Sequence, residues 1–367
     1  MAEQLPTRIE AVTPAWLTAR LEGRYPGLVV QDIAIVEVIH GTTTKVRANL
    51  TLNAAGLGHG VPRAVCIKSN LEDHAPVSMS HGLYDTEALF YRDIRPLIPL
   101  PAPLCYYAEA DPRAADGTSS QGFILLEDVK AQGATFGANT RPVSVDEAAA
   151  ALEDLATLHA HWWAGDGLDR FSWLETSHGP GTRHARLMEV KGGLPGITEL
   201  LVGAPERAAV MPASVLEPDR FIAAYDALVA HEMASPEPRC FIHGDTHLGN
   251  SYRTTDGKLR WLDWQLVRKG RCFRELSYFL GCALTVEDRR SSERPLIGHY
   301  LDHLRAKGVA APSAETAWGE YRLWPMWGLY CWIVTQDYKQ PREVVIETIR
   351  RFAVAMDDFD NYGLLLG

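Results

Sequence analysis

The chain has 367 residues, of which 46% are hydrophobic and 22% charged, a composition that is ordinary for a globular protein large enough to form two lobes. Its formal net charge of −10 argues against a nucleic-acid partner, which requires a basic face. No apolar stretch is long enough to span a membrane, and the first residues lack the basic and apolar regions of a signal peptide, so we expect a cytoplasmic protein.

The first third of the chain is predicted to be rich in strands. Thr13 and Pro14 mark the start of a helix that ends before Pro26. Hydrophobic periodicity then predicts, in chain order, strands at 29–39 and 46–52, a loop at 56–62, a strand at 64–68, a helix at about 80–95, and strands at 104–109 and 122–128 joined by a polar loop.

The first hairpin turn, around Gly41, Thr42 and Thr43, has the small residues of a loop that covers phosphates. Protein kinases use several glycines in that loop, so a plain hairpin is an equally good interpretation of these residues alone.

Lys68 ends an otherwise apolar strand, where a charge is costly unless it has a partner. Glu87, on the helix that follows, is the candidate partner, because kinases fix the lysine that binds phosphate by pairing it with a helix glutamate. We predict that Lys68 binds the first two phosphates of ATP. The alternative is that both side chains are simply solvated.

A hinge is predicted at about 125–133, where the strand at 122–128 ends in acidic residues and Gly133 follows. Backbone groups of Leu126, Glu127 and Asp128 are candidates for binding adenine. The hinge divides the chain into a nucleotide-binding lobe, 1–128, and a catalytic and substrate-binding lobe, 129–367.

The second lobe is predicted to be mainly helical. Helices are expected at 145–164, capped by Ser144, at 197–210, at 218–233 and through most of 273–359, with strands at 240–242 and 258–264. His159 and His161 are interpreted as packing residues. The six cysteines are scattered and form no Cys-x-x-Cys pair, so we expect free thiols and no cysteine zinc site.

The segment 241–250, followed by 261–264, contains the candidate catalytic and metal-binding residues. Asn250 follows Asp245 by five residues, and Asp263 comes at the end of a short apolar run. In a phosphotransferase that uses magnesium and ATP or GTP, Asp245 would accept or orient the proton of the attacking hydroxyl. Asn250 and Asp263 would hold Mg²⁺, which prefers hard oxygen ligands.

A metal-dependent hydrolase is one alternative, because His243, Asp245 and His247 alternate along the chain. The string Gly-Asp-Thr-His resembles one motif of the calcineurin-like metallophosphoesterases. Their downstream Gly-Asn-His is missing here, since Ser251 follows Asn250, and no upstream Asp-x-His is found. A pseudokinase that binds nucleotide without catalysis is the other alternative.

Together these motifs resemble the aminoglycoside phosphotransferase and choline-kinase-like superfamily, including its ecdysteroid-kinase-like branch. The resemblance implies an α+β, protein-kinase-like fold of two lobes, a small β-rich N-lobe and a larger, mostly helical C-lobe. It also implies transfer of the terminal phosphate of ATP or GTP to a hydroxyl of a small molecule. The matching residues are Lys68, Glu87, His243, Gly244, Asp245, Asn250, Asp263 and Trp264.

One departure from the family stands at Glu275, where many members carry an aspartate in an Asp-Leu-Ala-Tyr string. Glutamate can still cap or pair with the catalytic loop, but its longer side chain leaves the inherited role open. The acceptor is open as well. Four tryptophans at helical spacing lie in the region expected to bind the acceptor: Trp318, Trp324, Trp327 and Trp332. Such tryptophans usually belong to a core. If these line a pocket, they favour an apolar or quaternary-ammonium acceptor.

Overall fold

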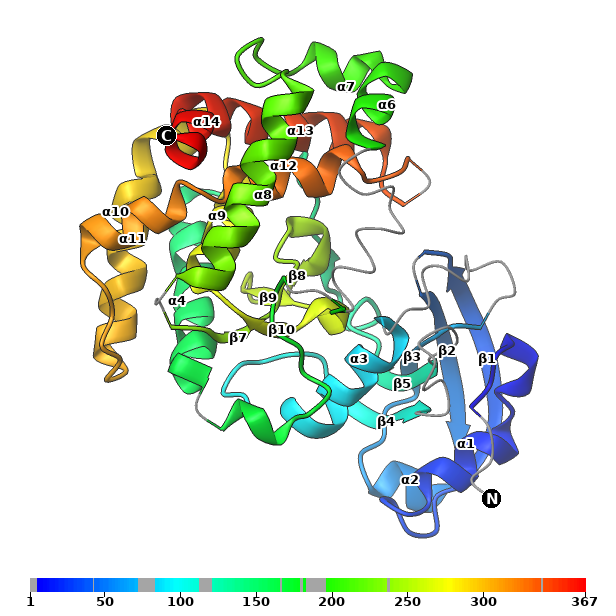
Figure 1. Ribbon diagram of the computed structural model, residues 1–367. Coiled ribbons are helices and arrows are strands. Elements are labelled where there is room, and N and C mark those ends of the chain that lie inside the picture. The colour runs from blue at the N-terminus through cyan, green and yellow to red at the C-terminus, as the bar shows by residue number, and fades with distance from the viewer. Residues whose placement is uncertain are drawn as a thin grey trace. The chain divides into compact units, whose positions relative to one another are not determined.

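The computed structural model describes residues 5–41, 43–71, 83–111, 121–165, 167–178, 181–182, 196–235, 238–337 and 339–367. Contacts divide the chain into two compact units. The first comprises Met1–Thr135, Thr254–Asp256 and Leu262–Leu266, and the second comprises Phe136–Arg253, Gly257–Trp261 and Val267–Gly367. The first unit is built on a sheet and the second is mainly helical, so the predicted α+β class is confirmed (Figure 1).

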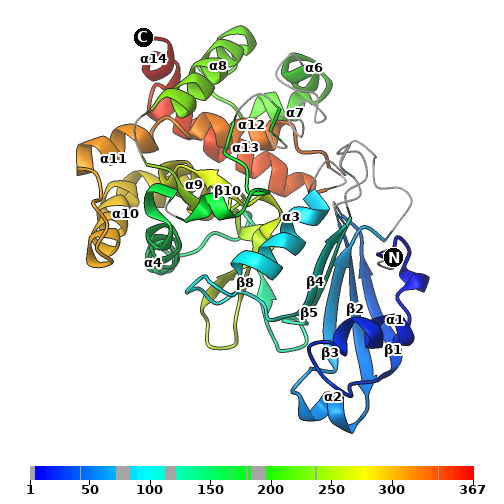
Figure 2. The same cartoon turned by 60° about the horizontal axis from the view of Figure 1, so that its bottom comes forward.

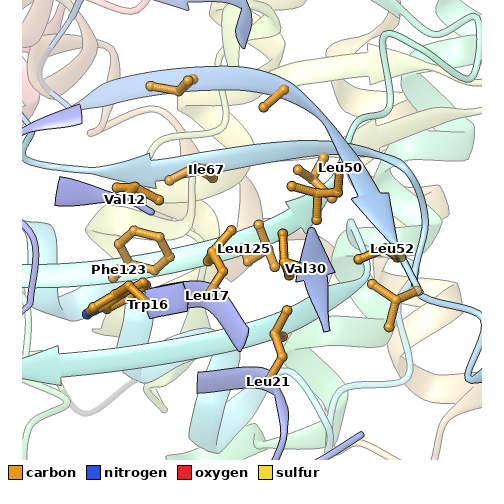
Figure 3. Packing of buried hydrophobic residues seen from close by; sticks show 14 of the residues in the cluster. Val12, Trp16, Leu17, Leu21, Val30, Leu50, Leu52, Ile67, Phe123 and Leu125 are labelled. Atoms are coloured by element: carbon orange, nitrogen blue, oxygen red, sulfur yellow. The ribbon is translucent and has the colours of Figure 1, made fainter. Parts of the chain in front are cut away.

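The first unit contains a five-stranded antiparallel sheet of order β1-β2-β3-β5-β4. Its strands are β1 (Val30–Ile39), β2 (Thr44–Leu52), β3 (Ala64–Ser69), β4 (Cys105–Asp111) and β5 (Gln121–Glu127). Helix α1 (Pro14–Leu21) begins at the predicted cap, where the Trp16 N–H donates to Thr13 Oγ1 at 3.2 Å. Figure 3 shows α1 residues packed against side chains of the sheet such as Phe123 and Leu125.

Two predictions for this unit need correction. The loop predicted at 56–62 overlaps a helical turn, α2 (Ala54–Gly58), which forms because the Asn53 side chain accepts the Gly56 N–H at 3.0 Å and caps it. Strand β2 begins at Thr44 rather than Val46, which places Lys45 inside the sheet and directly opposite Lys68 of β3. Side chains opposite each other on neighbouring strands share one face.

Helix α3 (Leu83–Leu89) continues into a π-helical turn, Phe90–Ile94, and packs beside β4 and β5 (Figure 2). A Cβ atom at Gly122 of β5 would overlap the Tyr84 backbone, so only glycine allows this close approach. The first residues of the predicted helix, 80–82, and the polar loop at 112–120 lie outside the described residues.

The second unit is organised around α9 (Cys272–Ala283), in which every residue is buried. Its other helices are α4 (Val145–His161), α6 (Gly196–Gly203), α7 (Pro205–Ala209), α8 (Pro218–Ala234), α10 (Val286–Ala306), α11 (Ala314–Tyr321), α12 (Pro325–Ile333), α13 (Arg342–Asp358) and α14 (Asn361–Leu366). Helices α4, α10, α11, α12 and α13 contact α9. Among the described residues, no helix is both long and apolar enough to cross a membrane.

Short strands in the second unit lie at the ends of the segment 241–250 and just before Asp263. Strand β7 (Cys240–Ile242) pairs with β10 (Arg268–Gly270), and β8 (Ser251–Arg253) pairs with β9 (Leu259–Trp261). Strand β6 (Thr135–Phe136) lies at the boundary of the units. The strand predicted at 258–264 ends at Trp261, so Asp263 follows the strand instead of belonging to it.

The helix predicted at 197–210 is interrupted before Pro205, which lacks a backbone N–H and starts α7. His159 is fully buried, as the packing interpretation expects, whereas the His161 side chain is exposed and contacts the Trp162 ring, with centroids 4.5 Å apart. The six cysteines are free, as predicted.

Candidate functional site

In the first unit, Lys68 is the centre of a buried ionic cluster. Its Nζ lies 2.5 Å from Glu87 Oε2 and 2.8 Å from Asp263 Oδ1. The side chains of Lys68 and Glu87 are only 5% and 3% exposed. Burial alone would lower the pKa of Lys68, but the carboxylates of Asp263 and Glu87 outweigh it and raise the pKa above its usual value. Lys68 is therefore held as an ammonium.

Glu87 joins two parts of this unit. Burial raises the pKa of the Glu87 carboxyl, and the charge of Lys68 opposes that shift. Besides its pair with Lys68, it accepts the Trp264 backbone N–H on Oε1 at 3.1 Å. The Trp264 ring also stacks on Phe90, with centroids 4.4 Å apart and planes 7° apart. These contacts hold residue 263 next to Lys68.

Asp263 adopts a left-handed backbone conformation, with φ of 65°. A residue other than glycine seldom adopts this region, because the Cβ is crowded there. The strain is offset by the contacts on both sides, the Lys68 ion pair and the Trp264 hydrogen bond.

The hairpin turn predicted to cover phosphates contributes a second lysine. Lys45 lies opposite Lys68, and a Cβ built on Gly41 would be 3.8 Å from Lys45 Nζ, so this half-buried ammonium lies against the exposed turn residue Gly41. Burial, followed by the charge of Lys68, lowers the pKa of Lys45. Thr43 is buried, and Thr42 lies outside the described residues.

At the predicted hinge, Leu126 and Glu127 end β5 and Asp128 follows. The N–H groups of Glu127 and Asp128 already donate to the carbonyls of Leu104, at 2.9 Å, and Ala64, at 3.3 Å. An adenine contact at these residues would therefore have to use their carbonyl oxygens. The Asp128 carboxylate accepts from Arg47 Nε at 2.9 Å, which connects the hinge to β2.

In the second unit, Asp245 follows a turn at Gly244, whose φ of 83° favours glycine. Asn250 Nδ2 donates to Asp245 Oδ2 at 2.9 Å and to the Asp245 carbonyl at 3.0 Å. Tyr278 Oη donates to Asp245 Oδ1 at 3.2 Å. Both carboxylate oxygens are thus oriented, and the side chain is still 20% exposed.

Glu275 holds the backbone of the predicted catalytic loop, residues 243–250. Its carboxylate accepts the N–H of Gly244 at 2.6 Å and of His243 at 3.2 Å, and it is hydrogen bonded to His159 Nε2 at 2.8 Å. Burial raises the pKa of Glu275, but the hydrogen bond and charge of His159 and its other partners outweigh burial and lower it. The longer glutamate side chain therefore reaches the backbone at His243 and Gly244.

His159 links that carboxylate to a third helix. Its Nδ1 is hydrogen bonded to Tyr300 Oη of α10 at 2.7 Å, so α4, α9 and α10 all contribute to one buried network. The other end of the loop is fixed by the Leu248 N–H, which donates to Asn139 Oδ1 at 3.1 Å.

The residues that suggested a hydrolase do not gather as metal ligands. His243 is fully buried, and its Nδ1 accepts the Asp245 N–H at 3.3 Å. His247 Nδ1 accepts the Gly249 N–H at 3.0 Å. In the part of the chain that the structure describes, no cluster of potential metal ligands includes these residues. Both histidines shape the loop instead.

Three of the four tryptophans singled out in the sequence, Trp324, Trp327 and Trp332, are buried, as the core interpretation predicts. Trp327 already has a cation against its ring: the Arg274 guanidinium carbon lies 4.0 Å from the ring centroid. Arg274 is itself buried, and both residues line a narrow gap that Gly244 and Tyr278 also border.

Sequence reasoning did not find Lys45 or Tyr278. A signal existed for both. The pairing of the second and third strands would have placed Lys45 opposite Lys68, and Tyr278 lies one helical turn after Glu275, on the same face of α9.

Neither a protein-family model nor a curated protein matches this sequence. The fold is similar to that of a protein from Ralstonia eutropha JMP134, provisionally named an aminoglycoside phosphotransferase, with a TM-score of 0.51, 12% identity, and coverage of 94% of this chain and 96% of that one. At this identity the similarity shows the fold and not the reaction.

Two further solved structures align over most of their length. Plasmodium vivax ethanolamine kinase has a TM-score of 0.49 and 8% identity, over 95% of this chain and 87% of that one. A thermostable mutant of the aminoglycoside phosphotransferase APH(4)-Ia, in ternary complex with ADP and hygromycin B, has a TM-score of 0.45 and 15% identity, over 95% and 98%.

Proposed function

We propose that this chain is a magnesium-dependent small-molecule kinase, which transfers the terminal phosphate of ATP or GTP to a hydroxyl of its acceptor. The observation that supports this best is the buried Lys68, paired with Glu87 on one side and Asp263 on the other. A buried cation flanked by two carboxylates is costly as a purely structural device, and it is the arrangement that kinases use for nucleotide phosphates.

In this proposal the first unit binds the nucleotide. Lys68 neutralises the phosphates that are not transferred, and Glu87 keeps its ammonium in place. Lys45 adds a second positive charge beside the Gly41 turn, whose backbone would cover the phosphates. Adenine or guanine would contact the backbone near Leu126, Glu127 and Asp128.

The residues proposed for Mg²⁺ suit it chemically. The Asn250 amide nitrogen donates to Asp245, so the Oδ1 oxygen of Asn250 is the atom left to bind a cation. Asp263 supplies a carboxylate, and both are hard oxygen donors. Bound there, the ion would neutralise the charge that develops on the phosphates.

The second unit activates the acceptor. Asp245 orients the acceptor hydroxyl and takes its proton as the oxygen attacks the terminal phosphorus, while the bond from that phosphorus to the bridging oxygen breaks and the nucleoside diphosphate leaves. Asn250 and Tyr278 fix the carboxylate in one orientation, so that little reorganisation is needed during transfer.

Charge in this unit bears on the acceptor. Arg268 and Arg274 are both buried; burial, followed by the charge of Arg274, lowers the pKa of Arg268 to about 9, while the charge of Asp245 opposes that shift. Among the described residues, neither Nη atom of Arg274 has a hydrogen-bond partner. Two guanidinium groups near the catalytic loop disfavour an ammonium acceptor, so we propose a neutral or anionic alcohol.

The proposal is tested by thermal unfolding with ATP or GTP, with and without magnesium, for the wild type, Asp263→Asn and Asp245→Asn. A ligand that binds only the native state raises the unfolding midpoint. We expect a magnesium-dependent rise for the wild type, its loss in Asp263→Asn, and its retention in Asp245→Asn, with phosphate transfer to a panel of alcohols lost in both variants.

No rise with either nucleotide at millimolar concentration would overturn the kinase assignment. A rise without phosphate transfer to any alcohol would favour the pseudokinase alternative. Transfer by Asp245→Asn at the wild-type rate would remove Asp245 from the mechanism.

A further inference from the structure

Three potential metal ligands that are not assigned to the reaction converge on the surface of the second unit. Glu153 of α4 faces His299 and His303 of α10, and their ligand atoms all lie within 4.8 Å of one another. The two helices lie side by side (Figures 1 and 2). The histidines are four residues apart, so they project from the same face of α10.

The distances suit a tetrahedral metal ion. His299 Nε2 lies 3.0 Å from Glu153 Oε1, and His303 Nε2 lies 3.5 Å from the same oxygen. A tetrahedral zinc ion with bonds of about 2.0–2.1 Å separates its ligand atoms by about 3.3 Å. These two separations bracket that value, and the ligand atoms of the two histidines lie within 4.8 Å of each other, so an ion could bind all three atoms after the side chains adjust.

The set of donors selects the kind of metal. Two imidazole nitrogens and one carboxylate oxygen suit zinc and its neighbours in the first transition row, and they suit magnesium poorly. The side chains of Glu153, His299 and His303 are 45%, 36% and 34% exposed, which leaves room for a water molecule as the fourth ligand.

We propose that Glu153, His299 and His303 form a zinc site that clips α4 to α10. Because of its position, this zinc site would also support the predicted catalytic loop. His299 precedes Tyr300, and Glu153 lies upstream of His159 on α4, so the ion would fasten the two helices whose Tyr300–His159 contact supports Glu275. The site is structural, distinct from the proposed magnesium ligands, and its existence does not depend on the proposed kinase activity.

The competing explanation uses hydrogen bonds alone. Each histidine can donate an Nε2–H to Glu153 Oε1, since one carboxylate oxygen accepts two donors. The two explanations differ in what they predict for added metal, because a hydrogen-bonded cluster without an ion gains nothing from zinc.

The experiment measures zinc binding by titration calorimetry and zinc-dependent unfolding on the full chain after treatment with a chelator. Variants are His299→Gln, His303→Gln and Glu153→Gln. The matched control is His231→Gln, which breaks a histidine–carboxylate contact of the same length, 3.0 Å to Glu320; no second histidine of the described residues joins this pair in a cluster of potential metal ligands. Cobalt absorption separates nitrogen and oxygen ligands from binding at the free cysteines, whose thiolates give charge-transfer bands.

We expect one zinc ion per wild-type chain and a raised unfolding midpoint. Since even residues that only orient a metal ligand cost tenfold or more, each of the three variants should bind at least about tenfold more weakly, while His231→Gln binds like the wild type. The ligands are partly exposed, so the variants should unfold like the wild type in chelator. Absence of binding at about 100 μM zinc, or equal binding by the wild type and all three variants, would overturn the proposal.

Discussion

The contact between Glu275 and the predicted catalytic loop makes Glu275→Gln an informative perturbation. The carboxylate is fully buried, and its two oxygens together accept two backbone N–H groups and contact His159. The amide keeps one acceptor oxygen but turns an NH₂ group towards one of these donors. Losing a hydrogen bond to a charged group costs about 1.5–3 kcal/mol, and leaving a buried N–H unsatisfied costs about 1–3 kcal/mol more.

We therefore expect Glu275→Gln to lower the free energy of unfolding by about 3–5 kcal/mol, within the range found when one partner of a buried pair is removed. Urea unfolding followed by tryptophan fluorescence measures it. The exposed Glu315→Gln, on α11, is the control and should stay within about 1 kcal/mol of the wild type. Glu275→Asp keeps the charge but shortens the side chain, so its loss should be intermediate.

The pH dependence gives a second measure of the same contact. The pKa of Glu275 is lowered in the folded state, so its contribution is fully present above the ordinary carboxyl pKa of about 4.3 and is lost as pH falls through the folded pKa. Glu275→Gln should lack that part of the acid-induced loss. A cost under about 1 kcal/mol, or strict additivity with His159→Gln, would refute the reasoning.

Three further predictions test other parts of the molecule. Lys45→Ala should weaken nucleotide triphosphate binding by about 10–100-fold, because a charge-assisted contact is lost, whereas the exposed Arg63→Ala should not; calorimetry measures both. The hydrogen bond to Glu320 raises the pKa of His231 in the folded state. The stabilisation that His231 provides is therefore full below the ordinary histidine pKa of about 6.5 and is lost as pH rises through the folded pKa. Unfolding measured over a pH series should show this loss for the wild type and not for His231→Gln. Gly137→Ala should destabilise the second unit by about 1–3 kcal/mol and reduce turnover, because its Cβ would overlap the Leu248 carbonyl oxygen in the predicted catalytic loop. Unchanged urea unfolding would contradict this.

The elements that the sequence predicted well are those specified by neighbouring residues. Thr13 and Ser144 cap helices where expected, and Ser144 forms a full capping box with Glu147. The strands of the sheet were predictable because their apolar residues alternate, as in β2. The boundaries that were wrong, at α2 and Pro205, depended on a single side chain or ring.

The contacts that orient the candidate site were not predictable in the same way, because they join residues far apart in the chain. The sequence motifs predict a glutamate partner for Lys68, but only the fold brings Asp263 to the same ammonium. Likewise, the length of the Glu275 side chain does not by itself show whether the carboxylate reaches the Gly244 N–H. That depends on the position of α9, which only the fold gives.

The path of the chain around Asp263 shows why adjacency in sequence misleads here. Asp245 and Asp263 are close together in the sequence, yet Asp263 belongs to the first unit, with Leu262–Leu266, while Asp245 belongs to the second. The segment is held in the first unit by the stacking of Trp264 on Phe90 and by the Glu87 hydrogen bond, so the apolar ring after the aspartate has a structural purpose. Consequently, variants of Lys68, Glu87 or Trp264 should alter nucleotide binding, whereas variants of Tyr278 or Glu275 should alter turnover and the stability of the second unit.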